Sequence, residues 1–166
     1  MIPEGIAIRP ARHDDVETLV KFNAAMAFET ERRRLDLATL RQGTLAFLES
    51  GGYGFYIVAE LPDDKSFRPV GQLMITYEWS DWRNGAFWWI QSVYVVPDRR
   101  GLGVFRAMYD YIFSKAKADP RICGIRLYVE RENRQAQTVY QRVGFSPSVY
   151  IVFEQDFVLS REVLQK

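Results

Sequence analysis

The sequence has one cysteine, Cys123, and one histidine, His13, among its 166 residues. One cysteine cannot form a disulfide within the chain, and one of each cannot build a zinc site from Cys and His ligands. No spacing typical of an all-carboxylate metal site is present either, so we expect no metal.

Excess charge and long apolar runs are also missing. The chain has 22 Lys and Arg against 21 Asp and Glu, for a net charge of +1. No overall field therefore draws the chain to nucleic acid. No apolar run approaches the ~18 residues of a membrane span, and the N-terminus lacks the apolar core of a signal peptide. We expect a cytoplasmic protein with neither a nucleic acid nor a membrane as partner.

Hydrophobic periodicity indicates one α/β (α+β) domain over residues 1–166. Alternating or apolar runs predict strands at residues 6–11, 54–61, 69–79, 86–97, 123–130 and 148–157. Helical spacing predicts helices at residues 12–29, 35–50, from about 103 onward, and 133–145. Residues 62–68 read as a charged turn and Asn84-Gly85 as a hairpin turn. The predicted order is β-α-α-β-β-β-α-β-α-β.

The stretch "VYVVPDRRGLGVFRAMY", residues 93–109, places a glycine-rich turn between a strand and a helix. The P-loop pattern is absent, and a dinucleotide fingerprint fails because Arg106 occupies its third glycine position. A less demanding interpretation is an anion site, because the first N–H groups of a helix lack internal partners and carry partial positive charge. The alternative is a plain turn with solvated arginines.

A second stretch, "ENRQAQTVYQRVGF", has an asparagine just before a helix and a tyrosine on the apolar face of that helix. Taken alone, Asn133 is explained as a helix cap and Tyr140 as a packed core residue.

Read together, the two stretches resemble the GNAT superfamily of N-acetyltransferases. Its cofactor motif is similar to Val-x-Pro-x-x-Arg/Gln-x-x-Gly-x-Gly/Ala, and residues 95–105 read Val-Val-Pro-Asp-Arg-Arg-Gly-Leu-Gly-Val-Phe. The later motif, Asn-x-x-Ala-x-x-x-Tyr-x-x-x-Gly-Phe, matches Asn133, Ala136, Tyr140, Gly144 and Phe145. The resemblance implies a mixed, mostly antiparallel, twisted sheet of about six to seven strands with four helices. Phe105 departs from the pattern, and we expect its ring to pack inward.

The resemblance also implies a reaction, the transfer of an acetyl group from acetyl-CoA to a primary amine. Cofactor contacts would come from Val93, Tyr94, Val95, Arg100, Gly101, Leu102, Gly103, Val104, Phe105 and Asn133. Tyr140 would be the general acid that protonates the departing thiolate. Related polyamine acetyltransferases carry Glu-Asp where this chain has Gln91-Ser92, so the general base must lie elsewhere or act through water. Glu29, Glu78 and Glu130 are the candidates, with solvated surface carboxylates as the alternative for the first two.

Four tryptophans within residues 79–89 suggest an aromatic wall near the acceptor, because Trp88 and Trp89 must face opposite sides of a strand. Aromatic walls beside Glu29 or Glu78 would suit a cationic small-molecule amine. A peptide or protein acceptor is the alternative substrate, and a non-catalytic acyl-CoA-binding regulatory module is the alternative function. The last strand or the tryptophan-rich hairpin could support a homodimer.

Overall fold

The structure of the chain is a computed structural model that describes residues 3–63 and 66–158. By their contacts these residues divide into two units, one within residues 1–128 and the other within 129–166. The first unit contains β1 (Ala7–Pro10), α1 (Val16–Glu31), α2 (Leu37–Ser50), β2 (Gly54–Asp63), β3 (Ser66–Ser80), β4 (Gly85–Val95), α3 (Val104–Ala118) and β5 (Ile122–Leu127). The second contains α4 (Arg134–Arg142).

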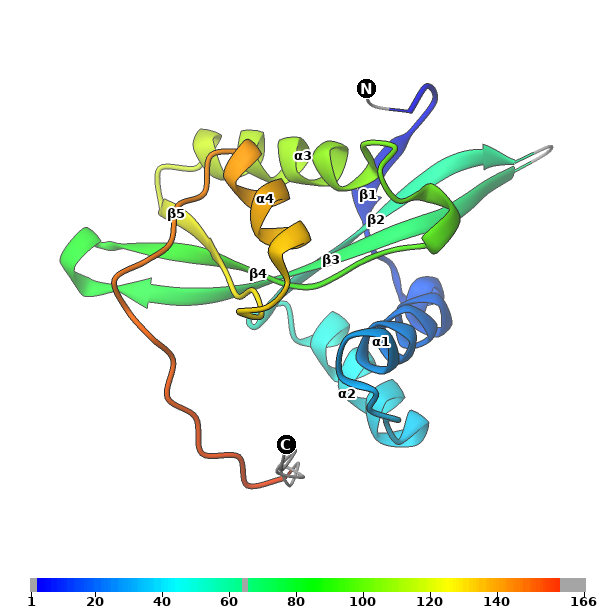
Figure 1. Cartoon of the computed structure of the whole chain (residues 1–166), viewed down its shortest axis with the longest axis horizontal. Helices are drawn as coiled ribbons and strands as arrows, with labels where there is room; N and C mark the ends of the chain where they lie inside the picture. The colour runs from blue at the N-terminus through cyan, green and yellow to red at the C-terminus, as the bar shows by residue number, and fades with distance from the viewer. Residues whose placement is uncertain (1–2, 64–65, 159–166) are drawn as a thin grey trace. The chain divides into compact units, whose positions relative to one another are not determined.

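The first unit is built on one mixed sheet with the strand order β1-β2-β3-β4-β5. The pairs β1–β2, β2–β3 and β3–β4 are antiparallel, and the pair β4–β5 is parallel. This confirms the predicted mixed, mostly antiparallel sheet with four helices among the described residues (Figure 1).

Helices cover both faces of this sheet, with α1 and α2 on one face and α3 on the other (Figure 1). Neighbouring residues of β3 show the division, because Gln72 bonds to Asn23 of α1 while a Cβ at Gly71 would touch Val104 of α3. The fully buried core side chains include Leu19, Ile57, Leu73, Ile75, Met108 and Ile112. The apolar side chains of the strands and helices therefore pack against one another on both faces of the sheet.

Local signals in the sequence determine where several helices and strands begin or end. Asp36 caps α2 by accepting a hydrogen bond from the Thr39 N–H at 2.7 Å. Asn84 closes the β3–β4 connection with φ 47°, a left-handed conformation that asparagine tolerates better than most residues. The predicted bounds of the charged turn, residues 62–68, were wrong, because β2 extends to Asp63 and β3 begins at Ser66. Residues 64–65 lie outside the described ranges.

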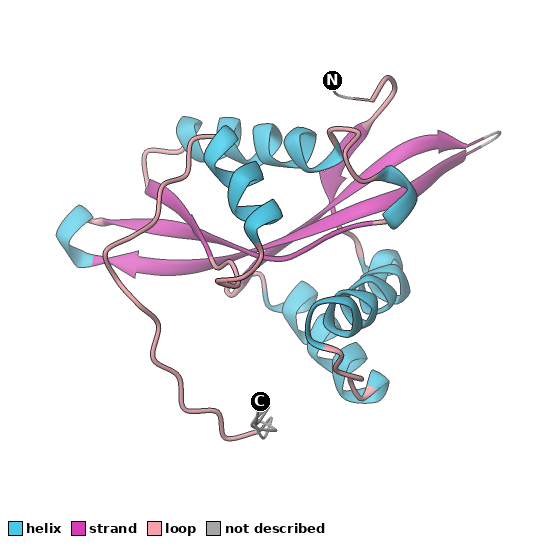
Figure 2. Cartoon of the chain, in the orientation of Figure 1, coloured by secondary structure: helices cyan, strands magenta, loops and turns pink. Residues whose placement is uncertain are grey.

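The sixth predicted strand, residues 148–157, is not a strand in the structure. Figure 2 draws this segment as a loop, and the described chain has five strands rather than six to seven. Its apolar side chains are exposed, with 88% of Phe153 accessible to solvent. The alternating pattern identified a segment able to form a strand, but no strand of the described chain pairs with it.

Candidate functional site

Strand β4 continues past the end of its neighbour β5. Their parallel pairing runs from Ala86 opposite Ile122 to Ile90 opposite Leu127, where β5 ends. Strand β4 continues to Val95, so residues 91–95 extend beyond the last β5 pair in the described sheet. Strand β5 was expected to reach residue 130 but ends at Leu127.

A bulge on β4 follows its last pair with β5. Gln72 of β3 faces Tyr94, whereas Met74 faces Gln91, so two residues of β4 oppose one residue of β3. One of the two, Ser92, has φ 48°, which is unusual for a residue with a side chain. Bulges re-aim neighbouring groups and are common beside active sites. Of the residues assigned to the cofactor from sequence, Val93 is the other bulge residue, and Tyr94 and Val95 follow it.

A buried chain of uncharged polar groups holds the bulge. The Gln72 amide, which is fully buried, donates to Asn23 Oδ1 at 2.7 Å and to the Ser92 carbonyl at 3.2 Å. The Asn23 amide in turn donates to the Tyr56 hydroxyl at 3.2 Å, and burial raises the pKa of Tyr56. Sequence reasoning missed these residues, although a glutamine inside the apolar run "PVGQLMI" was a usable signal.

The glycine-rich turn after β4 ends in an uncapped helix start. A 3-10 turn spans Pro97–Arg99, and Gly101 and Gly103 have φ values of 75° and 85°. No side chain caps α3 at Gly103, and the first intrahelical bond there runs from the Ala107 N–H to the Gly103 carbonyl at 3.0 Å. The first N–H groups of an α-helix precede its internal bonds and point out of its start. This arrangement can accept an anion such as a pyrophosphate.

The Phe105 ring packs along α3. It stacks on Tyr109, one helical turn further on, with ring centroids 6.3 Å apart. Phe105 is half-buried. Its ring therefore has an aromatic neighbour on the helix itself.

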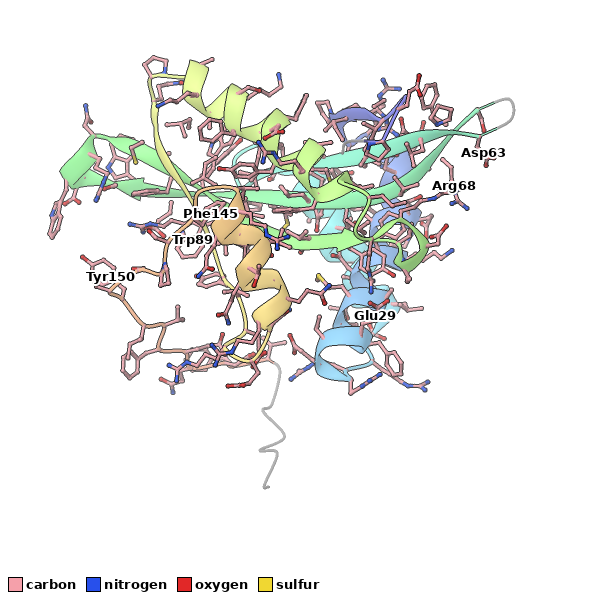
Figure 3. All side chains as sticks on the ribbon, turned by 45° about the horizontal axis from the view of Figure 1, so that its top comes forward. Glu29, Asp63, Arg68, Trp89, Phe145 and Tyr150 are labelled. Carbon is pink, nitrogen blue, oxygen red and sulfur yellow. The ribbon has the colours of Figure 1, made fainter. Side chains whose placement is uncertain are left out.

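Arg100, predicted to lie at the phosphate-binding turn, reaches α1 through its side chain. Its Nε donates to the Val95 carbonyl at 2.8 Å, and its Nη2 lies 2.6 Å from Glu29 Oε2. The Tyr94 hydroxyl donates to the other Glu29 oxygen at 3.0 Å. Burial, and then the bonded Glu29 charge, raise the pKa of Tyr94. The turn and the candidate base Glu29 are thus joined in one cluster, and Figure 3 labels Glu29 on α1.

Glu78, the second candidate base, lies on the sheet with both oxygens bonded. It accepts from Trp89 Nε1, and Arg126 Nη1 lies 2.5 Å from its other oxygen. The Trp89 ring, labelled in Figure 3, stacks against Tyr128 with centroids 4.3 Å apart. Trp88 is buried on the opposite face, so the predicted division of the two tryptophans is confirmed. An aromatic wall beside a carboxylate is present, but an arginine already neutralises the carboxylate.

The second unit carries the other predicted site residues. Asn133 Oδ1 accepts from the Ala136 N–H at 3.0 Å, so Asn133 caps α4 as expected. Tyr140 is half-buried, its ring meets Phe145 edge to face at 6.2 Å, and burial raises its pKa. Burial thus disfavours the ionised phenolate of Tyr140. The Glu130 carboxylate accepts from the Glu132 N–H at 3.1 Å.

Two further observations concern only the described residues. They contain no group of three or more His, Cys, Asp or Glu side chains able to hold a metal ion. Residues 3–63 and 66–158 also include no helix long and apolar enough to cross a membrane.

Comparison with known families identifies the class of this fold. The model of the acetyltransferase (GNAT) family matches residues 17–145, which is more than half of the chain and reaches into both units. The chain therefore belongs to the GNAT family of acetyltransferases. No match was found among curated proteins.

Solved structures agree with this assignment. A possible acetyltransferase from Clostridium difficile 630 is 42% identical with a TM-score of 0.84, over 94% of this chain and 100% of that one. At 18% identity, a predicted acetyltransferase with acetyl-CoA from Clostridium acetobutylicum gives a TM-score of 0.70 over 90% and 96%. NAA60 of Arabidopsis thaliana, in complex with a bisubstrate analogue, is 21% identical with a TM-score of 0.64 over 85% and 84%. The last two show likeness of fold.

Proposed function

We propose that this protein transfers the acetyl group of acetyl-CoA to a primary amine of a small molecule, by direct attack within a ternary complex. The observation that carries the proposal is the stretch of β4 that continues past the end of β5, with a bulge at its start and a helix start without a side-chain cap after it. We also propose that the two units act as one acetyltransferase domain over residues 1–166, because the family match reaches into both.

The first unit would hold the cofactor. The turn from Arg100 to Phe105 would bind the pyrophosphate through backbone N–H groups, since glycine conformations and the helix dipole favour an anion there. The backbone from Val93 to Val95 would bind the pantetheine arm and polarise the thioester carbonyl. A fixed N–H at that carbonyl stabilises the oxyanion that develops during attack. Asn133 of the second unit completes the proposed set.

Proton transfer would fall to side chains with suitable chemistry. Tyr140, at the tyrosine position of the family motif, would protonate the departing CoA thiolate. Glu29 or Glu78 would take the proton of the attacking amine, either directly or through water. Each of these carboxylates also holds an arginine, so accepting a proton would weaken an existing ion pair. Both carboxylates together with Trp89 would favour a cationic acceptor. The cytoplasmic location stays a prediction.

The test is release of CoA thiol from acetyl-CoA across polyamines, amino acids, aminoglycosides and short peptides, with Tyr140→Phe beside the wild type. We expect turnover with one class of small amine and a loss of about 100-fold or more in kcat for Tyr140→Phe. Tyr150→Phe is the matched control, because Tyr150 is an exposed tyrosine outside the family motif.

The outcomes separate the competing functions. Turnover with peptides alone would replace the small-molecule acceptor by a protein acceptor. Binding of acetyl-CoA without turnover on any amine would favour a regulatory module and contradict the proposal. Full activity of Tyr140→Phe would remove Tyr140 as the acid while leaving the acetyltransferase assignment intact.

A further inference from the structure

Arg126 of β5 is held in place on the face of the sheet by an aromatic ring and a carboxylate. Its guanidinium carbon lies 3.7 Å from the centroid of the Phe87 ring, and its Nη1 donates to Glu78 at 2.5 Å. Glu78 is fixed in turn, because its other oxygen accepts from Trp89 Nε1. Since 33% of the Arg126 side chain is exposed, this oriented group can still reach a ligand.

The sequence leaves room for the ring that carries Arg126. Phe87 pairs with Gly124, which precedes Arg126 by two residues on β5 and therefore shares its face of the sheet. A Cβ at Gly124 would lie 2.5 Å from Phe87 Cε1, closer than side chains come to one another. Phe87 is buried. Glycine at this position thus allows the ring to approach the β5 backbone and to support the guanidinium.

One edge of the Arg126 guanidinium is open. Nη1 bonds Glu78, and among the described residues no group accepts a hydrogen bond from Nε or Nη2. The Nε and Nη2 groups form an edge whose parallel N–H groups match the two oxygens of a carboxylate. An arginine that is already stacked and anchored loses less freedom on binding than a mobile one. The open edge is therefore a preorganised site for an oxyanion.

The charge around the Phe87 ring also favours an anion. A second guanidinium, that of Arg83, lies 5.2 Å from the centroid of the same ring. Glu78 neutralises Arg126, whereas Arg83 forms no ion pair within the part of the chain that the structure describes. Asp81, in the same turn as Arg83, pairs with neither arginine there. Two arginines therefore share one paired carboxylate beside the ring.

The arginine site lies on the face of the sheet that α1 covers. Alternate residues of a strand share a face, so Glu78 of β3 lies on the face of Gln72, whose side chain bonds Asn23 of α1. Arg126 bonds Glu78 and shares this face. Glu29 also belongs to α1, and Figure 3 labels it there. The candidate base and the arginine site thus belong to one side of the sheet.

The arginine site is remote from the place where the amine would react. Arg126 faces Trp89 in the sheet, and the backbone proposed to polarise the thioester begins further along β4, at Val93. At about 3.3 Å per residue, about 13 Å of strand separates Trp89 from Val93. A peptide of about four residues spans this distance. An acceptor that reaches both places carries its anion at the end opposite its amine.

We propose that Arg126 binds an oxyanion of the acceptor, so that the substrate is a primary amine with a carboxylate about 13 Å from the reacting nitrogen. The inference rests on the proposed function, for which it names the acceptor. The amine lies toward Val93 and Glu29, and the two carboxylate oxygens accept from Nε and Nη2 of Arg126 in parallel. Arg83 adds attraction at longer range.

The Trp89 indole reports on this site without requiring turnover. Its N–H bonds Glu78, which holds Arg126, so an anion on Arg126 should shift the Trp89 indole signal in a proton–nitrogen NMR spectrum. The protein is titrated, in the presence of CoA, with oligoglycines of one to five residues, each as the free carboxylate and as the uncharged C-terminal amide. Carboxylates of three to five residues should shift the signal, and the amides should not. Trp79, on the opposite face of the sheet, is the internal reference.

Steady-state assays with acetyl-CoA test the consequence for specificity. In the wild type, kcat/KM should be about 10- to 100-fold higher for the carboxylates of three to five residues than for their amides, as charge-assisted hydrogen bonds predict. Arg126→Gln should bring this ratio to about 1 and leave kcat/KM for the amides within about 2-fold. Arg126→Lys keeps the charge without the parallel edge and should retain part of the preference. Arg121→Gln is the matched control, because Arg121 is 84% exposed and pairs with Asp119.

The outcomes separate this inference from the proposed function. Equal turnover of carboxylates and amides, or a preference that survives Arg126→Gln, would overturn the oxyanion site and leave acetyl transfer standing. A Trp89 shift that is specific to carboxylates and lost in Arg126→Gln, without turnover of any amine, would support the site and contradict the proposed function. An equal preference for carboxylates at every length would overturn the placement of the anion far from the amine. The wild-type comparison of carboxylate with amide decides the question even where a variant fails to fold.

Discussion

Two sets of polar contacts surround the β4 strand, and they are built differently. The bulge accepts a hydrogen bond from Gln72 at the Ser92 carbonyl, and Gln72 also bonds Asn23. Both side chains are uncharged and buried. The candidate bases Glu29 and Glu78 are held by arginines, and 36% and 41% of their side chains are exposed. Buried neutral networks are costly to break, whereas exposed ion pairs contribute little and exchange partners readily.

The difference suits the different tasks proposed for the two sets. A backbone that must keep an N–H aimed at a thioester carbonyl needs a support that water cannot reach. A carboxylate that must accept a proton, or attract a cationic substrate, needs access to water and to other partners. The predictions below test this division.

The largest effect is expected for Gln72→Leu. The substitution keeps an apolar side chain of similar size but leaves Asn23 Oδ1 and the Ser92 carbonyl without the Gln72 amide. Each buried group left unpaired costs about 1–3 kcal/mol, so the free energy of unfolding should fall by about 2–4 kcal/mol in urea denaturation. Acetyltransferase kcat should also fall, because the bulge loses its support.

Gln91→Leu is the matched control for Gln72→Leu. Gln91 makes one side-chain bond, to Thr76 Oγ1 at 2.6 Å, and is half-buried on the same face. Its loss should lower the free energy of unfolding by about 1 kcal/mol or less. Equal effects of the two substitutions would show that burial does not distinguish the two sites.

A smaller loss of stability is expected for Asp15→Asn, because Asp15 is both charged and buried. Arg9 bonds both Asp15 and Glu60, with Arg9–Asp15 at 2.7 Å and Arg9–Glu60 at 2.6 Å. Burial raises the pKa of Asp15, but the Arg9 bonds and the Arg12 N–H outweigh it, so the pKa is lowered overall. Asp15→Asn should lower the free energy of unfolding by about 1–3 kcal/mol at pH 7.

The pH dependence of Asp15→Asn follows from that lowered pKa. The stabilisation is fully present above the pKa of the unfolded aspartate, about 3.9, and disappears as the pH falls through the lower pKa of the folded state. The difference between wild type and variant in urea denaturation should therefore be constant from pH 5 to 7 and shrink below about pH 4. Asp14→Asn, at an exposed neighbour, should show no such trend. A difference that persists at pH 2 would assign the effect to packing.

The parts of the site that the sequence predicted are those specified by neighbouring residues. The glycine turn before α3 and the Asn133 cap each depend on groups a few residues apart, and both were found as expected. The arginine partners of the candidate bases could not be predicted, because Arg126 is 48 residues from Glu78 and Arg100 is 71 from Glu29. Such pairs depend on strand register and on which helix packs over which strand.

The strand predicted at residues 148–157 is a second example of what a local sequence pattern cannot specify. Alternation of apolar side chains shows which face a segment can bury, and that local inference needs no knowledge of the fold. Which edge covers that face, and in which molecule, depends on contacts that a local pattern does not specify. The same holds for β5, whose apolar run predicted a strand to residue 130 although pairing with β4 ends at Leu127.

The smallest effects on stability are expected at the carboxylates of the two ion pairs, although loss of the one that serves as general base would lower kcat. Glu29→Gln and Glu78→Gln should each change the free energy of unfolding by less than about 1 kcal/mol, as is usual for exposed ion pairs. If the acceptor is cationic, each substitution should raise the KM of the acceptor about 2- to 5-fold in steady-state assays. The KM of acetyl-CoA should stay unchanged in Glu78→Gln. Asp81→Asn, at an exposed carboxylate in the turn after β3, is the control. Unchanged acceptor KM in both variants would exclude a cationic acceptor at this face, whereas a loss of stability above 2 kcal/mol would show that these pairs support the fold as the Gln72 network does.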